Sequence, residues 1–326
     1  MKQHSILKKA LTNFSRNGAL VILVIAVAAF AVLTKGKNIS LSNIVNILTQ
    51  VSSVGIMAVG MTMVIIDRGI DLSVGGVACL SVVVAAVGMV KLGLPWYVCI
   101  VFMIITGLFI GFINGILIAK LKMQPFICTM AMLKTTQGIA YYIMQGKTLF
   151  GLPEQWAFFG QSKFLGLPIC VWLLIILGFV AFLVLKYSRF GRELYAMGGN
   201  PQAAWMAGIN VDLNRIVAYM ISSFCATVAG LIISSRIMCA QTSIGDGSEL
   251  DAIASAVIGG VSMAGGEGGV VGAIIGAIII SVINNGLNLM AVSPYLQTVI
   301  KGLVIFFAVI FDIIRRRNME QLKVNN

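Results

Sequence analysis

Residues 191–209 read GRELYAMGGNPQAAWMAGI, a polar stretch in a chain whose other segments are mostly apolar. Asn200 is a favourable N-cap because its side-chain oxygen can accept a bond from a free backbone N–H, and Pro201 suits the first position of a helix. Gly208 suits the left-handed conformation that often ends a helix. The stretch therefore predicts a short surface helix over 202–207. Because so short a helix is marginally stable alone, it needs a surface to pack on, either a soluble partner or the neighbouring helices.

The composition places the rest of the chain in a membrane. Hydrophobic residues make up 59% of the 326 residues, charged residues make up 10%, and the mean hydropathy is +0.99. A soluble domain of this composition would expose large apolar patches, whereas several runs here reach the ~20 residues that a helix needs to cross a bilayer. We expect an all-α, polytopic helix bundle of about ten spans, at residues 18–34, 44–66, 73–90, 97–119, 125–144, 169–186, 215–235, 249–263, 270–290 and 296–314.

These closely spaced spans form one expected membrane domain over 18–314, with basic tails at 1–17 and 315–326 and a polar loop at 187–214. Most of the 23 Lys and Arg residues fall on the side that holds the N-terminus, and basic loops face the cytoplasm. Both termini and the 187–214 loop are therefore expected in the cytoplasm. The formal net charge of +12 then mainly reflects the basic residues that set the topology, and these residues also attract anionic membrane lipid. Nucleic-acid binding is not expected.

Catalytic and metal-ion chemistry are not expected on this chain. The six cysteines are scattered without a CxxC pair, and the single histidine, His4, lies in the N-terminal tail. The tripeptide Gly146-Lys147-Thr148 resembles the end of a phosphate-binding loop, but position 141, where that motif needs glycine, is Tyr141. No cofactor is therefore expected here, and any hydrolysis of ATP, with its Mg²⁺, is assigned to a partner protein.

The two halves of the chain resemble each other weakly. The motif GIDLSVGG at 69–76 opens the third span, and ELDAIASAVIGG at 249–260 marks the eighth. The fourth span contains Asn114-Gly115, and the ninth contains Asn284-Asn285-Gly286. In both cases the echo comes five spans later, which inverts its orientation. Inverted repeats of spans two to five and seven to ten are therefore indicated, and such repeats commonly place a transport path at their interface.

Glycine ladders on the fourth and ninth spans predict close helix packing, because small residues let backbones approach. These ladders do not share one register with the asparagine echoes, so chance similarity between glycine-rich helices remains an alternative to true repeats. The ladders lie at 107, 111 and 115 and at 268, 272 and 276.

Few charges fall inside the expected spans, and Asp67 and Arg68 are interpreted as solvated at a helix end. An ion-coupled carrier would more often show charges inside several spans, so a neutral solute and an external energy source are favoured. Neutral amides and hydroxyls suit the hydroxyls of a sugar, although they also hydrogen-bond between helices. The candidates for the translocation pathway are Asp71, Ser73, Asn114, Asp251, Asn284 and Asn285.

Three motifs in this order resemble the signatures of bacterial sugar-importer permeases: GIDLSVGG, the 191–209 stretch, and ELDAIASAVIGGVSMAGGEGG from Glu249. These permeases form the ribose/galactose/xylose branch of the ATP-binding-cassette (ABC) transporters. The resemblance covers roughly residues 40–314 and looks closest to ribose-type and allose-type permeases. Related permeases for nucleosides, an autoinducer or branched-chain amino acids remain alternatives, as does an ion-coupled secondary carrier.

The resemblance implies a multi-pass subunit of the bacterial inner membrane that is not itself an enzyme. Two permease chains, expected as a homodimer, would form the channel. A cytoplasmic protein with two ATPase cassettes and a periplasmic sugar-binding protein are the implied partners. The family's cytoplasmic coupling motif, to which Trp205 adds an aromatic anchor, falls on Gly191, Arg192, Gly198, Gly199, Asn200, Pro201, Ala204, Trp205 and Gly208.

Overall fold

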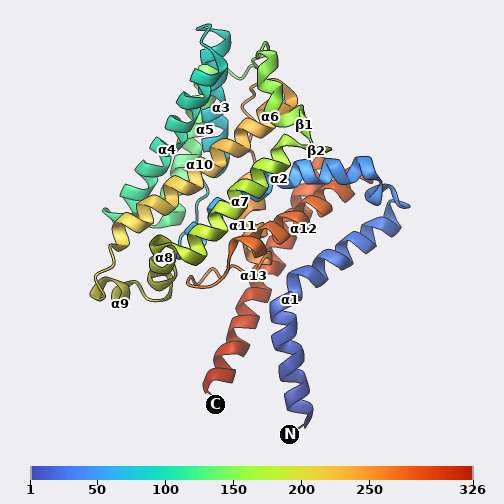
Figure 1. The fold of residues 1–326 in the computed structure, drawn as a ribbon, viewed down its shortest axis with the longest axis vertical. Coiled ribbons are helices and arrows are strands. Elements are labelled where there is room, and N and C mark those ends of the chain that lie inside the picture. Colours follow the sequence, from blue (N-terminus) through green and yellow to red (C-terminus); the bar gives the residue numbers. More distant parts are fainter. Residues whose placement is uncertain (1, 325–326) are drawn as a thin grey trace.

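The computed structural model describes residues 2–324, with side chains for 18–307 and 309–310; the two basic tails lie outside the residues whose side chains are described. Helices dominate this part of the chain, and both chain ends leave the bundle toward the bottom of Figure 1. A 3-10 helix (Lys37–Ile39), a second one (Glu154–Ala157) and an antiparallel pair, β1 (Lys163–Phe164) and β2 (Leu167–Pro168), lie in the connections. The α-helices are α1 (Lys2–Leu33), α2 (Leu41–Ile66), α3 (Val74–Val90), α4 (Trp96–Ala119), α5 (Pro125–Met144), α6 (Phe158–Gln161), α7 (Ile169–Tyr187), α8 (Arg189–Gly199), α9 (Pro201–Met206), α10 (Val211–Ile237), α11 (Ser248–Ile258), α12 (Val270–Leu289) and α13 (Pro294–Val324).

Five of these helices are long and apolar enough to cross a membrane by length and composition: α2, α4, α7, α10 and α12. Shorter apolar stretches occupy residues 18–33 of α1, all of α3, and residues 294–307 of α13. Each of the ten expected spans overlaps one helix, but α5 and α11 meet neither criterion. Both carry polar residues, and α11 has only 11 residues. The molecule is therefore a polytopic helical membrane protein, with a less regular set of spans than the sequence predicts.

Helices α2 and α10 form the centre of the bundle. In the most apolar stretch of each helix, 83% of the α2 residues and 67% of the α10 residues are buried, against 28% in α4 and 33% in α7. Helix α2 packs against α11 and α12, whereas α10 packs against α3 and α4. Each central helix thus contacts the third and fourth spans of the opposite half, while the outer faces of α4 and α7 carry exposed apolar side chains suited to lipid.

The glycine ladders do mediate close packing, as predicted, but against different partners. A Cβ at Gly111 of α4 would lie 2.7 Å from the carbonyl oxygen of Tyr219 in α10. On α12, a Cβ at Gly276 would overlap the carbonyl oxygen of Ser255 in α11. One ladder therefore joins the two halves and the other joins two helices of the same half. The ladders are not equivalent under any inverted repeat, which explains why their register disagreed with the asparagine echoes.

The segments that follow α2 and α10 turn back into the bundle. The thiol of Cys79, in the second turn of α3, lies 3.3 Å from the carbonyl oxygen of Thr242, which follows α10. Gly75 lies so close to the loop before α11 that a Cβ there would come 2.5 Å from the Gly245 oxygen. The starts of α3 and α11 therefore meet inside the fold, and each is preceded by a non-helical segment.

The expected eighth span, 249–263, is wrong beyond Ile258, where α11 ends. The next eleven or so residues form turns rather than helix, because the run AGGEGG places several glycines in the left-handed region that other residues avoid. This loop reaches the end of α2, since Gly266 N–H donates to the Ile66 carbonyl at 2.9 Å. The left-handed glycines are Gly260, Gly265, Gly266 and Gly268.

Candidate functional site

The polar 191–209 stretch forms two helices joined at a sharp corner. Helix α8 begins after Ser188, whose hydroxyl accepts from the Gly191 N–H at 3.0 Å. Asn200 adopts an extended conformation and ends α8. Its side-chain oxygen then caps α9 by accepting from the N–H groups of Gln202 at 3.0 Å and Ala203 at 3.1 Å. The predicted capped helix is confirmed as α9, whereas α8 was not predicted, although Ser188 was a readable N-cap signal.

Helix α9 presents apolar side chains to solvent outside the membrane spans. Trp205 is 71% exposed and Met206 is 76% exposed, whereas Ala204 is 4% exposed and holds the helix against the fold. Gly208 has φ +81°, with open space around it, and turns the chain toward α10. Exposed large apolar groups on an ordered surface helix typically mark a docking site.

Helix α8 is fastened to the end of α2. The Arg68 guanidinium donates to the carbonyl oxygen of Gly198 at 2.5 Å and also to that of Gly199. Gly198 lies directly on the last turn of α2, where a Cβ would overlap the Ile66 carbonyl oxygen. Gly199 has open space at the same point. The two adjacent glycines of the predicted motif therefore have different roles, and only Gly198 is required for contact.

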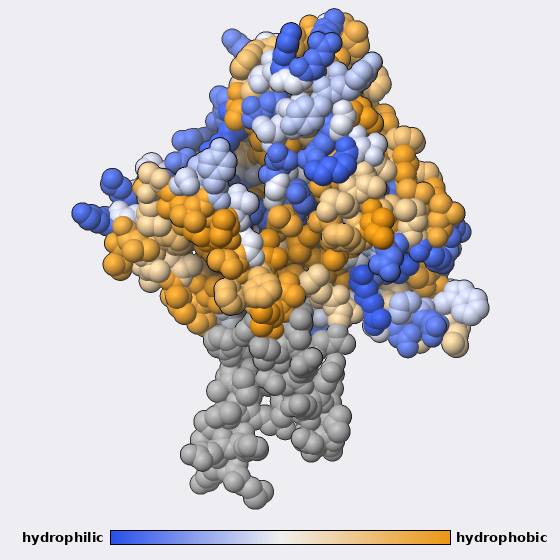
Figure 2. All heavy atoms as spheres, turned by 180° about the vertical axis from the view of Figure 1, so that it is seen from behind, coloured by the Kyte–Doolittle hydropathy of each residue, from blue (hydrophilic) through white to orange (hydrophobic). Residues whose placement is uncertain are grey.

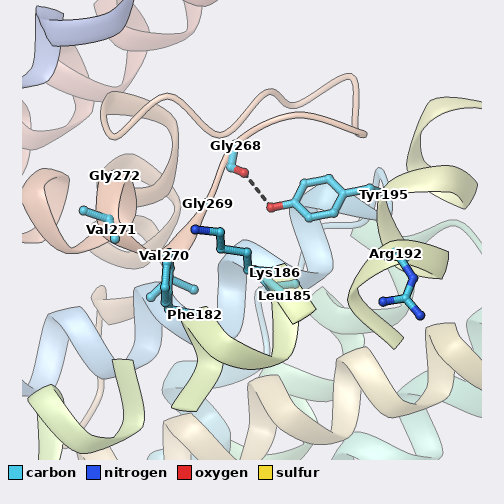
Figure 3. A pocket seen from close by; sticks show the side chains of 10 residues that line it. All are labelled: Phe182, Leu185, Lys186, Arg192, Tyr195, Gly268, Gly269, Val270, Val271 and Gly272. Carbon is cyan, nitrogen blue, oxygen red and sulfur yellow. Dashed lines mark hydrogen bonds between the residues drawn. The ribbon is translucent and has the colours of Figure 1, made fainter. Parts of the chain in front are cut away.

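Two further bonds tie α8 to the rest of this end of the bundle. The Tyr195 hydroxyl donates to the Gly268 carbonyl oxygen at 2.7 Å, beside a pocket that Lys186 and Arg192 also line (Figure 3). Burial raises the pKa of the Tyr195 hydroxyl, so it stays protonated and able to donate. Glu193 accepts from the Asn214 side chain of α10 at 2.7 Å. A hydrogen bond from Arg189 lowers the pKa of the Glu193 carboxyl, which keeps it ionised at neutral pH.

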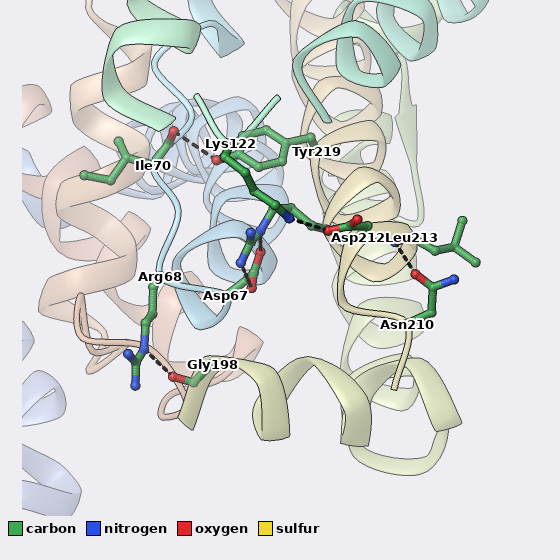
Figure 4. A network of polar contacts seen from close by, with 10 residues as sticks. Asp67, Arg68, Ile70, Lys122, Gly198, Asn210, Asp212, Leu213 and Tyr219 are labelled. Carbon is green, nitrogen blue, oxygen red and sulfur yellow. Dashed lines mark hydrogen bonds and ion pairs between the residues drawn. The ribbon is translucent and has the colours of Figure 1, made fainter. Parts of the chain in front are cut away.

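An ion-pair network holds the start of α10 (Figure 4). Arg215 donates to both oxygens of Asp67, at 2.7 and 3.1 Å, and the Asp67 side chain is 1% exposed. The expectation that Asp67 is solvated at a helix end is therefore wrong, because α10 covers it. Nearby, Lys122 pairs with Asp212 at 2.9 Å on the surface. Arg68, Tyr195 and Arg215 were not among the predicted site residues. The available signal was the position of Arg68 two residues after the second expected span and of Arg215 at the start of the seventh.

The first group of pathway candidates lies in a buried hydrogen-bond network. Asp71 accepts from the Ser73 hydroxyl at 2.6 Å and from the Ser222 hydroxyl of α10 at 2.8 Å. The Asn114 amide of α4 donates to Ser73 at 2.9 Å. All four residues are fully buried. In this conformation the network joins α3, α4 and α10 and faces no open channel.

The second group is divided between a buried pair and a partly exposed cluster. Asn285 and Asn43 of α2 exchange two amide hydrogen bonds, at 2.8 and 3.0 Å, and both are buried. Asp251 pairs with Lys301 of α13 at 2.9 Å and lies 3.5 Å from the Asn284 amide. The structure thus brings Asp251 and Asn284 together and separates them from Asn285, which has a helix-packing role.

The fold and the ordered polar segment between α7 and α10 fit a multi-pass membrane permease. The chain belongs to the family described as the permease component of the branched-chain amino acid transport system, whose model matches residues 43–309. Similar proteins are the ribose import permease of Haemophilus influenzae (40% identical, covering 84% of this chain and 85% of the relative) and that of Escherichia coli K12 (39%; 90% and 92%). The D-allose permease of Escherichia coli K12 is 34% identical (92% and 92%). No solved structure matches the chain significantly.

These relatives confirm the predicted class. The chain is a multi-pass permease subunit of a bacterial ABC importer in the inner membrane, and it is not an enzyme, because ATP hydrolysis in such importers resides on a separate subunit. The ion-coupled carrier is not favoured. The expectation that few charges lie inside the spans needs correction nonetheless, since the structure buries the carboxylates of Asp67, Asp71 and Asp251.

Proposed function

We propose that two copies of this chain form the channel of a binding-protein-dependent importer for a monosaccharide of the ribose or allose kind. The relatives named for ribose and allose support this cargo. A cytoplasmic double-cassette ATPase, which holds the ATP and Mg²⁺, and a periplasmic sugar-binding protein complete the importer. The related cargoes, namely nucleosides, an autoinducer or branched-chain amino acids, are the alternatives that a transport assay separates.

The observation that carries the coupling role is that the α8–α9 segment is both exposed and fastened. Its outer side offers Trp205 and Met206 to a partner. Its inner side is hydrogen-bonded to the end of α2 through Arg68, to α10 through Glu193, and to the loop before α12 through Tyr195. A force applied to α9 is therefore passed to three elements of the membrane domain. Closure of the ATPase cassettes would move the segment and re-orient the two half-channels.

For the topology, we propose ten spans in a single domain over 18–314, with both termini and the 187–214 loop in the cytoplasm. The reciprocal packing of α2 on α11 and α12, and of α10 on α3 and α4, supports inverted repeats. Asn114 of α4 bonds near the start of α3, and Asn284 of α12 lies near Asp251 at the start of α11. These matching contacts support the asparagine echoes as equivalent positions.

A reconstituted importer tests the proposal. The chain is placed in proteoliposomes with the double-cassette ATPase and the sugar-binding protein of the same importer, and uptake is measured for a panel of sugars, nucleosides and branched-chain amino acids. We expect uptake of a pentose or hexose that requires ATP, the binding protein and the permease together. Accumulation of solute by the permease alone, driven by an ion gradient, would refute it. ATP-dependent uptake of an amino acid or nucleoside would keep the class and change the cargo.

A further inference from the structure

Polar side chains from three membrane helices lie at one depth in the bundle. Gln137 of α5, Asn284 of α12 and Lys301 of α13 each lie about 8–10 Å from the helix end that is farther from α8 and α9, at about 1.5 Å of rise per residue. Under the proposed topology these helix ends lie at the membrane surface, which places the three residues inside the hydrocarbon region of about 30 Å. Charged and strongly polar groups at such a depth are costly and typically mark a substrate path or a paired structural site.

These residues are joined to the start of α11 by a chain of contacts. Lys134 donates to Gln137 at 3.3 Å, and Gln137 donates to Asp246 at 2.9 Å. Five residues further on, Asp251 accepts from Lys301 at 2.9 Å. The loop and first turn of α11 thus carry the carboxylates, while α5 and α13 supply one lysine each from opposite sides.

Some polar atoms in and beside this group of residues have no hydrogen-bond partner. Lys134 and Asp246 are exposed, although both lie beside helices that otherwise show apolar side chains to the membrane. Behind them, the Glu249 Oε2 and Asn284 Oδ1 atoms are buried and have no hydrogen-bond partner among the described residues. A purely structural ion-pair network would satisfy its buried acceptors, because a buried polar atom without a hydrogen-bond partner is destabilising.

We infer that this cluster, formed by Lys134, Gln137, Asp246, Asp251, Asn284 and Lys301, is the polar lining that a monosaccharide contacts as it crosses the outer half of the membrane. The inference rests on the proposed function. Each sugar hydroxyl both donates and accepts a hydrogen bond. The cluster offers ammonium and amide donors beside carboxylate and amide acceptors, so a neutral polyol finds partners of both kinds.

The cluster lies beside the point where two helix starts meet. In Figure 2, hydrophilic surface runs from the top of the view into the middle of one face, with hydrophobic surface on both sides. The starts of α3 and α11 meet close behind the cluster, since Gly75 contacts both Gly245 and Glu249. Helix starts that converge within the membrane are typical of transporter binding sites. Of the predicted pathway residues, the cluster thus retains Asp251 and Asn284, while Asp71, Ser73, Asn114 and Asn285 support the helices around them.

Cysteine labelling tests whether the cluster faces water. Gln137→Cys is compared with Val101→Cys, which lies at a similar depth on α4 and is 54% exposed toward the apolar surroundings. The six native cysteines are all buried, so background labelling is low. In the full importer, we expect a membrane-impermeant thiol reagent added from the outer side to modify Gln137→Cys at least about tenfold faster than Val101→Cys, and to block uptake. Equal rates at the two positions would overturn the inference.

Charge-neutral variants test whether the lining contacts the sugar. Lys134→Gln is compared with Lys91→Gln, an identical change at the exposed end of α3. We expect Lys134→Gln to lower sugar uptake at least about tenfold, the equivalent of one lost hydrogen bond of about 1.4 kcal/mol, with ATPase activity retained. Normal uptake by Lys134→Gln would overturn the inference. If the unmodified importer moves no sugar at all, the proposed function fails instead, and the labelling comparison still shows whether the cluster lines a water-accessible path.

Discussion

The Asp67–Arg215 pair provides the sharpest energetic prediction. Arg215→Gln removes the cation that pairs with Asp67 through two bonds, at 2.7 and 3.1 Å. The Asp67 side chain is 1% exposed, whereas the Arg215 side chain is 18% exposed. Removing one partner of a buried ion pair costs about 3–5 kcal/mol, because the remaining charge is left in a poor solvent. Arg215→Gln should therefore be strongly destabilising.

Protonation of the Asp67 carboxyl sets an upper limit on the loss of stability, because a neutral carboxyl can be buried without a cation. If Asp67 takes up a proton on folding, the cost at pH 7 is about 4 kcal/mol, since its ordinary pKa is about 4 and each pKa unit corresponds to about 1.4 kcal/mol. The raised pKa of the folded variant means that the folded state binds the extra proton. Its stability deficit should therefore shrink by about 1.4 kcal/mol for each pH unit below 7, down to about pH 4.

Unfolding by sodium dodecyl sulfate in mixed micelles measures this free energy at several pH values. The matched control is Lys122→Gln, which breaks the pair with Asp212 on the surface, where the two side chains are 67% and 30% exposed. An exposed pair contributes about 0–1 kcal/mol, so the control should change stability little and without a pH trend. An Arg215→Gln variant as stable as Lys122→Gln at pH 7, or one whose deficit grew as the pH fell, would refute the reasoning.

Three further predictions concern the α8–α9 segment and use uptake per ATP hydrolysed as the measure. Asn200→Ala should destabilise α9 by about 1 kcal/mol and lower the coupling. Asn200→Asp keeps the cap and should behave like the unmodified chain. Equal coupling in the two variants would exclude loss of the cap as the cause of the defect. Gly198→Ala should abolish assembly or coupling because its Cβ overlaps the end of α2. Gly199→Ala places its Cβ in open space and should have a mild effect. A larger defect in Gly199→Ala than in Gly198→Ala would contradict the contact. Trp205→Ala should weaken ATPase binding by about 2 kcal/mol or more without lowering membrane insertion, and unchanged binding would remove this side chain from the interface.

The cap at Asn200 and the membrane class could be predicted from the sequence because both depend on local chemistry. Asn200 caps α9 as predicted, since an Asn before Pro offers the same oxygen to the next N–H groups in any context. The end of α11 at Ile258 was missed, although the glycines that end it were visible. A hydropathy pattern reads Gly and Ala as ordinary members of a span, whereas the backbone conformation at Gly260 decides where the helix stops.

The contacts of the site residues could not be predicted from the sequence because they depend on which helices pack together. Arg68 looked like a solvated residue at a span end, and only the fold shows that it reaches the last carbonyls of α8. Asn285 looked equivalent to Asn284, yet one turns to Asn43 and the other to Asp251. Neighbouring residues on a helix point in directions about 100° apart, so adjacent asparagines contact different helices. Such choices require the packing partners to be known.

The attachment of α8–α9 explains how one surface segment can move both halves of the bundle. Helices α2 and α10 are the most buried of the five long apolar helices, and they lie in different halves of the chain. Helix α8 is bonded to the end of α2 through Arg68, and α9 leads directly into α10, whose start is held to α2 by Asp67 and Arg215. Close-packed helices transmit a displacement because their interfaces leave no free volume to absorb it. Under the proposed function, a partner that shifts α9 would therefore displace both central helices together, and each would carry the third and fourth spans of the opposite half with it.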